Sequence, residues 1–171
     1  MTQQWWSEPT AGEIVWCHFP DEIHPRPKPR PALVLAVFDD NAPQFDVRVA
    51  YGTSQRTTFL HRGEFSILRD RNAAAYAAAG LSYDTKFDLR QVLDLPYTSE
   101  WFSVPPTAPH GQTPKLGTLH PSLVRAVEAA FRAAKGKRPG LGLAQRGAGR
   151  DAERRMQTHV WTGPLPAIPS T

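Results

Sequence analysis

The chain has 171 residues and a formal net charge of +4, from 20 Lys and Arg against 16 Asp and Glu. This length favours one domain with a core of ordinary size and an appendage, and no apolar run approaches the roughly 18 residues of a membrane span. The first residues lack a basic segment followed by an apolar stretch, so we expect no secretory signal, no membrane partner and a cytoplasmic setting. The single Cys17 agrees with that setting.

The positive charge is concentrated at the C-terminal end of the sequence. Residues 1–135 carry 14 Lys and Arg and 14 Asp and Glu, whereas residues 136–171 carry 6 and 2. The second segment is also rich in Gly and Pro, which break regular structure. The sequence therefore predicts a folded domain over 1–135 and a flexible basic tail over 136–171.

The domain is expected to begin with a strand and a proline-rich arm. Residues 12–19 alternate as a strand does, and His18 is expected to be packed and hydrogen-bonded rather than catalytic. Closely spaced prolines then prevent a helix or a central strand over 20–31. The arm is either a solvated connection or a phosphate-contacting loop. Its basic side chains are His24, Arg26, Lys28 and Arg30.

Two neighbouring strands are predicted next, over 30–38 and 45–51. The first is apolar on both sides, which indicates burial of both faces, and the second alternates as a half-buried antiparallel strand does. Arg30 precedes Pro31, which favours an extended backbone and suits the first position of a strand. A guanidinium is thus expected at the mouth of a hydrophobic strand, where Thr53 and Ser54 could face it.

The rest of the domain is expected to contain two more strands, two helices and two segments of less regular structure. In chain order these are a strand over 64–68, a helix over 70–79 capped by Asp70 or Asn72 and ended by Gly80, a strand over 86–95, a short strand or aromatic lid over 97–104, a loop over 105–117 and a helix over 120–136. The last helix carries an apolar stripe from Leu123 to Ala134, which we expect to pack on the sheet.

The sequence supports few kinds of chemical site. It contains no Walker loop, dinucleotide fingerprint or paired-cysteine metal site, and its histidines lack metal-ligand spacing, so no metal or cofactor is expected. What remains is a cationic arm beside small hydroxyl residues. That combination suits an anionic substrate, most simply a phosphodiester.

Metal-free cleavage of RNA would assign distinct tasks to these residues. The protein must remove the proton of the 2′-hydroxyl nucleophile, stabilise charge on the phosphorus oxygens and protonate the leaving oxygen. Arg30 suits the second task through bidentate hydrogen bonds, but a permanently charged guanidinium is a poor proton donor. Thr53 could orient the phosphate, the alternative being a turn hydroxyl bonded to its own backbone. His24 is the nearest candidate for proton transfer.

Three segments of the chain resemble the PemK/MazF toxins of bacterial toxin–antitoxin systems. These are Gly12–Trp16, Arg30–Leu35 and Thr53–Gln55, in matching order and at similar spacing. Residues 86–89 and 123–134 are similar to a later strand and the C-terminal helix of that family, so the resemblance covers about 11–135. The Arg-Pro-hydrophobic strand is its most specific element.

The resemblance implies a mainly β fold with helices, an SH3-like β-barrel of the PemK/MazF/CcdB type with a C-terminal helix. It also implies a homodimeric, metal-independent endoribonuclease that cleaves single-stranded RNA and is neutralised by a cognate antitoxin. Arg30 and Thr53 are similar in position to the family's catalytic arginine and threonine. The remaining residues expected to contact RNA are His24, Arg26, Lys28, Ser54 and Gln55.

The chain departs from the family in ways that leave other functions open. Where the family has a Gly-rich loop with a Glu-Gln pair, residues 25–29 are Pro-rich and offer no carboxylate as a general base. Residues 70–80 resemble an insertion, and the basic tail has no counterpart. One alternative is a non-catalytic SH3-like barrel module that binds protein or nucleic acid. Another is a toxin that acts on a different target, because a fold does not fix chemistry.

Overall fold

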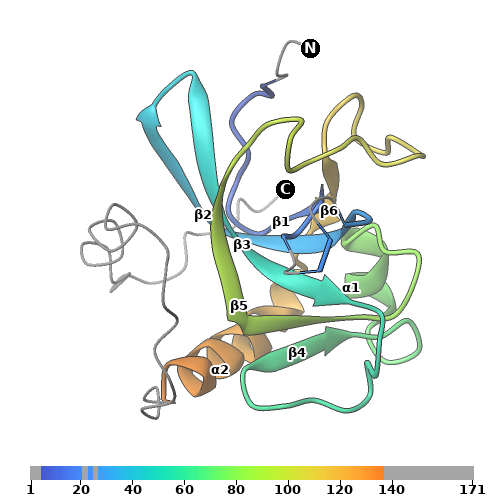
Figure 1. Cartoon of the computed structure of the whole chain (residues 1–171). Coiled ribbons are helices and arrows are strands. Elements are labelled where there is room, and N and C mark those ends of the chain that lie inside the picture. Colours follow the sequence, from blue (N-terminus) through green and yellow to red (C-terminus); the bar gives the residue numbers. More distant parts are fainter. Residues whose placement is uncertain (1–4, 21–22, 25–26, 137–171) are drawn as a thin grey trace. The chain divides into compact units, whose positions relative to one another are not determined.

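The computed structural model describes residues 5–20, 23–24 and 27–136 of the chain. Its elements are β1 (Glu13–Cys17), β2 (Arg30–Asn41), β3 (Gln44–Thr53), β4 (Glu64–Ile67), α1 (Ala73–Ala78), β5 (Thr85–Pro96), β6 (Lys115–Thr118), the 3-10 turn η1 (Pro121–Leu123) and α2 (Val124–Lys135) (Figure 1). The expected mainly β fold with a C-terminal helix is confirmed. The basic tail over 136–171 lies outside the described residues from Lys137 onward.

The six strands form one antiparallel sheet in the order β4-β5-β3-β2-β1-β6. Within the described part of the chain no ladder joins the edge strands β4 and β6, so hydrogen bonds do not close the sheet into a barrel. The sheet nevertheless curves, most visibly where the long strand β5 bends (Figure 1). The expected barrel is thus an open, strongly bent sheet.

The hairpin of β2 and β3 forms the centre of the sheet. Apolar side chains pair directly across it, for example Val34 with Val49 and Val37 with Val47. β-branched residues pack well on a pleated, half-buried surface, which favours strands in this part of the sequence. The hairpin therefore supplies the rigid frame from which Arg30 and Thr53 project.

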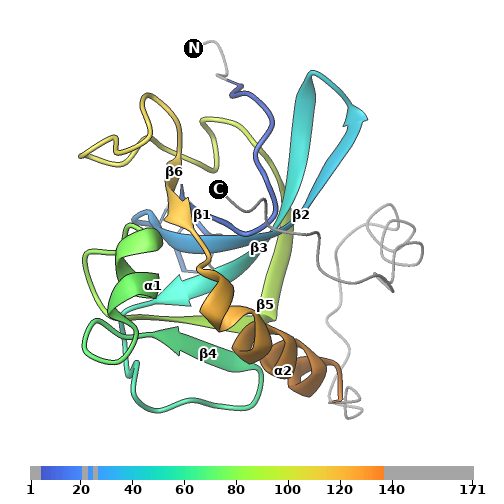
Figure 2. The ribbon, with the colours of Figure 1, turned by 180° about the vertical axis from the view of Figure 1, so that it is seen from behind.

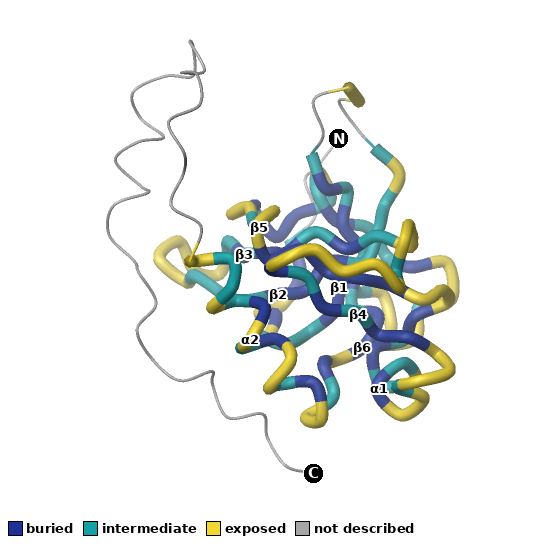
Figure 3. Tube along the Cα trace, turned by 90° about the horizontal axis from the view of Figure 1, so that it is seen from below, coloured by how far each residue is buried: buried dark blue, intermediate teal, exposed yellow. Residues whose placement is uncertain are grey.

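Each face of the sheet covers its own apolar core. The first core contains Ile14, Leu33, Phe65, Phe87 and Val127 among others, and lies between the sheet and the helices. The second core, on the opposite face, is built from the side chains Trp6, Val15, Cys17, Phe19, Ala32, Val34, Val47, Val49, Leu95, Tyr97 and Phe102. Figure 3 shows the resulting run of buried backbone through the strands, with exposed loops around it.

Helix α2 covers the first core and lies across β4 and β5 (Figure 2). The stripe expected from the sequence is confirmed, because Leu123, Val127 and Ala130 are buried and Phe131 packs against them. The ring of His120 accepts a hydrogen bond from the Ser122 N–H and so caps η1, where Pro121 has no N–H and needs no acceptor.

Three expectations about the local structure require correction. Helix α1 is shorter than expected, and the Asn72 side chain accepts from the Leu68 N–H instead of capping the helix. Residues 97–104 form neither a strand nor an aromatic lid, because Tyr97 and Phe102 are buried in the second core. The expected loop over 105–117 ends in the edge strand β6, which pairs with β1.

Candidate functional site

Arg30 and Thr53 lie at adjoining ends of the central hairpin. In the ladder of β2 and β3, Leu33 faces Ala50 and Ala32 faces Tyr51. The ladder ends with that pair, and two further residues in each strand lead to Arg30 and Thr53, which therefore lie at the same end of the hairpin.

The face from which the two side chains project is that of the second core. Arg30 alternates in step with Ala32 and Val34, and Thr53 in step with Val49 and Tyr51, and all four of these partners pack in that core or against it. Arg30 and Thr53 are only partly buried, so they lie where the apolar packing ends. No hydrogen bond or ion pair of the Arg30 side chain occurs among the described residues, which leaves its five donors for a ligand.

Gly52 allows the two strands to approach closely at this point. A Cβ atom added at Gly52 would lie 2.2 Å from the Pro31 carbonyl oxygen and 3.0 Å from the Phe87 ring. Any side chain here would push β2 and β3 apart immediately beside Arg30 and Thr53. Glycine at this position therefore keeps the spacing of the two candidate residues short.

The Thr53 hydroxyl takes part in the turn that follows β3. Its Oγ1 accepts a hydrogen bond of 3.1 Å from the backbone N–H of Gln55, which is the turn role weighed as the alternative for this residue. A hydroxyl has one proton and two lone pairs, so this contact leaves the Thr53 proton for a phosphate oxygen. Ser54 and Gln55 are exposed next to it.

The proline-rich arm enters the site beside the end of β1. His18 Nδ1 lies 2.8 Å from the Pro27 carbonyl oxygen, which confirms that this histidine is hydrogen-bonded. Because a carbonyl only accepts, the contact requires a proton on Nδ1. His24 and Lys28 are exposed on the arm, whereas Arg26 lies outside the described residues.

On its other side Arg30 is paired with Cys17 of β1. Cys17 is completely buried, and burial raises the pKa of its thiol far above the ordinary range. A thiol held in its neutral form is a poor nucleophile. Cys17 therefore acts as a small apolar residue beneath the arm.

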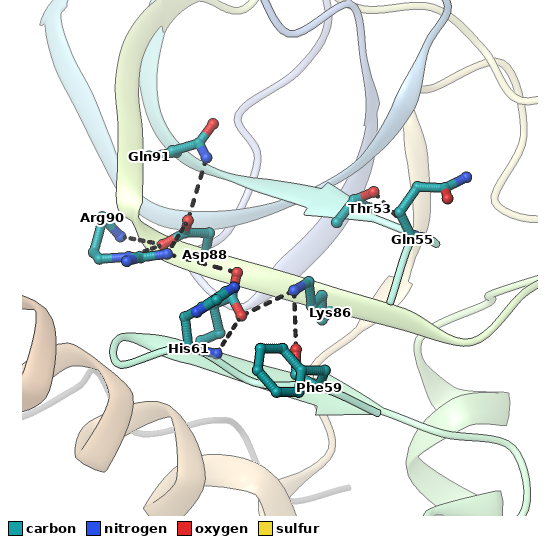
Figure 4. Close-up of polar contacts among 9 residues, drawn as sticks. Thr53, Gln55, Phe59, His61, Lys86, Asp88, Arg90 and Gln91 are labelled. Carbon is teal, nitrogen blue, oxygen red and sulfur yellow. Dashed lines mark hydrogen bonds and ion pairs between the residues drawn. The ribbon is translucent and has the colours of Figure 1, made fainter. Parts of the chain in front are cut away.

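Lys86 of β5 is the ladder neighbour of Thr53 and lies almost wholly buried. Its Nζ lies 3.0 Å from Glu64 Oε2 and donates to the Phe59 carbonyl oxygen at 3.1 Å (Figure 4). Glu64 is equally buried and also accepts from the His61 backbone N–H. This buried ion pair thus joins β4, β5 and the loop over 54–63.

Asp88 organises the bend in β5. Ala50 faces Val92 but Tyr51 faces Asp88, so residues 89–91 have no partners in β3. The Asp88 carboxylate accepts from the backbone N–H and the guanidinium of Arg90 at 2.9 Å and from the Gln91 amide at 3.2 Å. Burial would raise the pKa of Asp88, but these hydrogen bonds and the charge of Arg90 outweigh it and lower the pKa.

Asp88 is expected to make the stability of the fold depend on pH in the acid range. A carboxyl whose pKa is lower in the folded protein stabilises the fold above its unfolded pKa of about 3.9, and this contribution is lost as the pH falls through the folded value. In urea unfolding the wild type should therefore have a higher free energy of unfolding than Asp88→Asn at neutral pH. This difference should shrink as the pH is lowered from about 5 to about 2. Exposed Asp70→Asn serves as the control, and a difference independent of pH would contradict the assignment.

The buried charges were missed from the sequence. Lys86 and Asp88 alternate with Phe87 and Leu89, a pattern that indicates a solvated face opposite a core face. A signal for the ion pair was nevertheless present in the sequence. Glu64 alternates with Phe65 as Lys86 does with Phe87, so two expected strands carry opposite charges at equivalent positions. Of the residues expected to contact RNA, the structure brings Arg30, Thr53, Ser54 and Gln55 to one end of the hairpin.

Among the described residues, which span 5–136 with short gaps, no group of three or more His, Cys, Asp or Glu could hold a metal ion. None of the helices in this part of the chain is long and apolar enough to cross a membrane.

No protein-family model matches the sequence, and no curated protein matches it. A similar solved structure is an endoribonuclease in complex with its cognate antitoxin from a mycobacterial species, with 16% identity, a TM-score of 0.47 and coverage of 77% of this chain and 98% of that chain.

Proposed function

We propose that this chain is a PemK/MazF-like toxin, a metal-independent endoribonuclease that cleaves single-stranded RNA in the cytoplasm. One observation supports the proposal: the ladder of β2 and β3 ends with Ala32 opposite Tyr51, and two further residues in each strand lead to Arg30 and Thr53 at the same end of the hairpin. A guanidinium that has no hydrogen bond or ion pair among the described residues and a hydroxyl with a proton to donate suit the two non-bridging oxygens of a phosphodiester.

In the proposed reaction the 2′-hydroxyl of the RNA loses its proton and attacks the adjacent phosphorus. The bond from phosphorus to the 5′-oxygen of the next nucleotide breaks, and that oxygen takes up a proton. Negative charge grows on the non-bridging oxygens as the new bond forms, and Arg30 stabilises it there with parallel N–H donors. Thr53 holds one of these oxygens and thereby orients the phosphate. The flanking nucleotides are proposed to be bound by His24, Arg26, Lys28, Ser54 and Gln55.

A second candidate is a non-catalytic module that binds RNA or protein on the same face. The observation that favours it concerns the carboxylates beside Thr53, because Glu64 is held by Lys86 and Asp88 by Arg90. A carboxylate neutralised in this way is a weak acceptor for the 2′-hydroxyl proton. Binding would then persist without cleavage.

The experiment that separates these candidates is incubation of the purified protein with single-stranded RNA in the presence of EDTA. For a nuclease we expect cleavage by the wild type, its loss in Arg30→Ala and Thr53→Val, and its retention in Thr53→Ser, which keeps the hydroxyl. Induced expression of the same variants should give growth arrest only where RNA is cleaved. Intact RNA with the wild type, together with measurable RNA binding, would support the binding module instead.

The proposed toxin has two protein partners, a cognate antitoxin and a second copy of the chain. Both follow from the PemK/MazF resemblance of the Arg30–Leu35 and Thr53–Gln55 segments. Light scattering of the purified protein tests the homodimer, and a short neighbouring gene whose product abolishes the growth arrest tests the antitoxin.

A further inference from the structure

The loop over 54–63, between β3 and β4, exposes large apolar side chains immediately after Thr53. Phe59 is 62% exposed and Leu60 is 46% exposed. The Phe59 ring meets the His61 ring edge to face, with centroids 5.1 Å apart. Exposed aromatic rings are costly in water and are common where a protein stacks on a ligand.

The backbone of this loop is nevertheless held firmly. The Phe59 carbonyl accepts from buried Lys86, the His61 N–H donates to buried Glu64, and Arg62 donates to the Ala133 carbonyl of α2. The turn before it closes with a bond from the Phe59 N–H to the Arg56 carbonyl, and Arg56 adopts the left-handed conformation with φ of 49°. A non-glycine residue in that conformation costs about 1 kcal/mol or more, which the surrounding contacts must offset.

The charge of the loop indicates what its rings contact. Residues 53–63 contain Arg56, Arg62 and His61 but no Asp or Glu. Lys86 connects the loop to the ladder position beside Thr53, and Figure 4 shows Phe59 and His61 on one side of Lys86 and Thr53 on the other. Cations interleaved with an exposed aromatic ring are the surface on which single-stranded nucleic acid stacks its bases.

We propose that Phe59, supported by His61, is a stacking platform for a nucleobase of single-stranded RNA next to the phosphate bound at Arg30 and Thr53. The proposal rests on the proposed function for the position of that phosphate. The rigid backbone lowers the entropy lost on binding, because the ring is already presented to the ligand. Stacking is a contact with any base, so the platform contributes affinity before it contributes sequence preference.

The test uses strands that bind without being cleaved. Fluorescence anisotropy would measure the affinity of a labelled, mixed-sequence 2′-O-methyl oligoribonucleotide, which lacks the nucleophile, and of an abasic strand of the same length. We expect Phe59→Ala to weaken binding of the first strand by about 5- to 100-fold, and Phe59→Trp to retain it. Affinity for the abasic strand should not change in either variant.

The control is Tyr83→Ala, which removes another exposed aromatic ring, 75% exposed, from a different turn. It should bind both strands as the wild type does. The proposal would be overturned if Phe59→Ala bound the 2′-O-methyl strand as tightly as the wild type does. It would also be overturned if Phe59→Ala lost as much affinity for the abasic strand as for the 2′-O-methyl strand. If Phe59→Ala changes the molar mass of the protein in light scattering but leaves its RNA affinity unchanged, Phe59 belongs to a protein interface and the stacking proposal is wrong.

Cleavage of unmodified RNA, measured separately, keeps this proposal distinct from the nuclease. If the wild type does not cleave RNA but Phe59→Ala weakens its binding of the base-carrying strand, the stacking platform is supported and the nuclease activity is contradicted. If the wild type cleaves RNA and Phe59→Ala binds that strand as the wild type does, the nuclease activity is supported and the stacking platform is contradicted.

Discussion

Replacing Arg30 by lysine is expected to lower the rate of RNA cleavage by roughly 10²- to 10³-fold at saturating RNA, although the positive charge is kept. A guanidinium presents two parallel N–H donors to two phosphate oxygens, whereas an ammonium is a point charge that cannot match both. The Arg30 position is fixed by the ladder with Cys17, so a shorter-reaching head group cannot compensate by a backbone shift. Single-turnover cleavage of a defined oligoribonucleotide measures the effect.

The matched control for this substitution is Arg125→Lys. Arg125 is exposed on α2, which covers the first core and not the face that carries Arg30. This variant should cleave at the wild-type rate. If Arg30→Lys also cleaves at the wild-type rate, bidentate hydrogen bonding of Arg30 to the phosphate is wrong. Arg30 would then act only through the electrostatic attraction of its positive charge for RNA.

The central hairpin and the last helix could be predicted because their apolar residues repeat with a clear period. Alternation over 45–51 places Val47 and Val49 in the second core, and the stripe from Leu123 places Val127 and Ala130 in the first. These patterns depend only on the spacing of side chains along one element. The same alternation predicts that Arg30 and Thr53 lie close, since it sets the register of two adjacent strands.

Strand β6 could not be predicted because little in its sequence is specific to a strand. It has four residues, including Gly117, and it follows a segment rich in proline and glycine. A Cβ at Gly117 would lie 2.2 Å from the Ala78 carbonyl, so the glycine reflects close packing on α1. That constraint comes from a helix about 40 residues away, and local propensity is routinely overridden by such tertiary contacts.

Removing the Glu64 carboxylate is expected to lower the free energy of unfolding by about 3–5 kcal/mol. The side chains of Lys86 and Glu64 are only 7% and 6% exposed, so Glu64→Ala leaves an ammonium in the interior with the Phe59 carbonyl as its remaining partner. The His61 N–H also loses its acceptor. Urea unfolding at neutral pH measures the loss.

The control is Asp94→Ala, which breaks a bidentate ion pair at the surface. Arg48 and Asp94 are 31% and 49% exposed and bond at 2.7 Å, and such pairs contribute at most about 1 kcal/mol. Combining Lys86→Met with Glu64→Gln should recover most of the stability, because neither residue of the pair then carries a charge and the amide oxygen can accept from the His61 N–H. Equal decreases in the free energy of unfolding for Glu64→Ala and Asp94→Ala would show that the buried pair of Lys86 and Glu64 contributes no more to stability than the surface pair of Arg48 and Asp94.

The double variant Lys86→Met with Glu64→Gln also separates the stability of the fold from the order of the loop over 54–63. Methionine fills the space of the lysine stem but donates nothing to the Phe59 carbonyl, so the loop over 54–63 loses one of its anchors while the core keeps its packing. Hydrogen exchange of the backbone amides of residues 59 and 64, which bond to carbonyls within this loop, should then become faster than exchange in β3. RNA affinity should fall in this stable double variant, because the ring at Phe59 must then be ordered by the ligand instead of by Lys86. Unchanged exchange and affinity would mean that the loop is ordered without the buried pair.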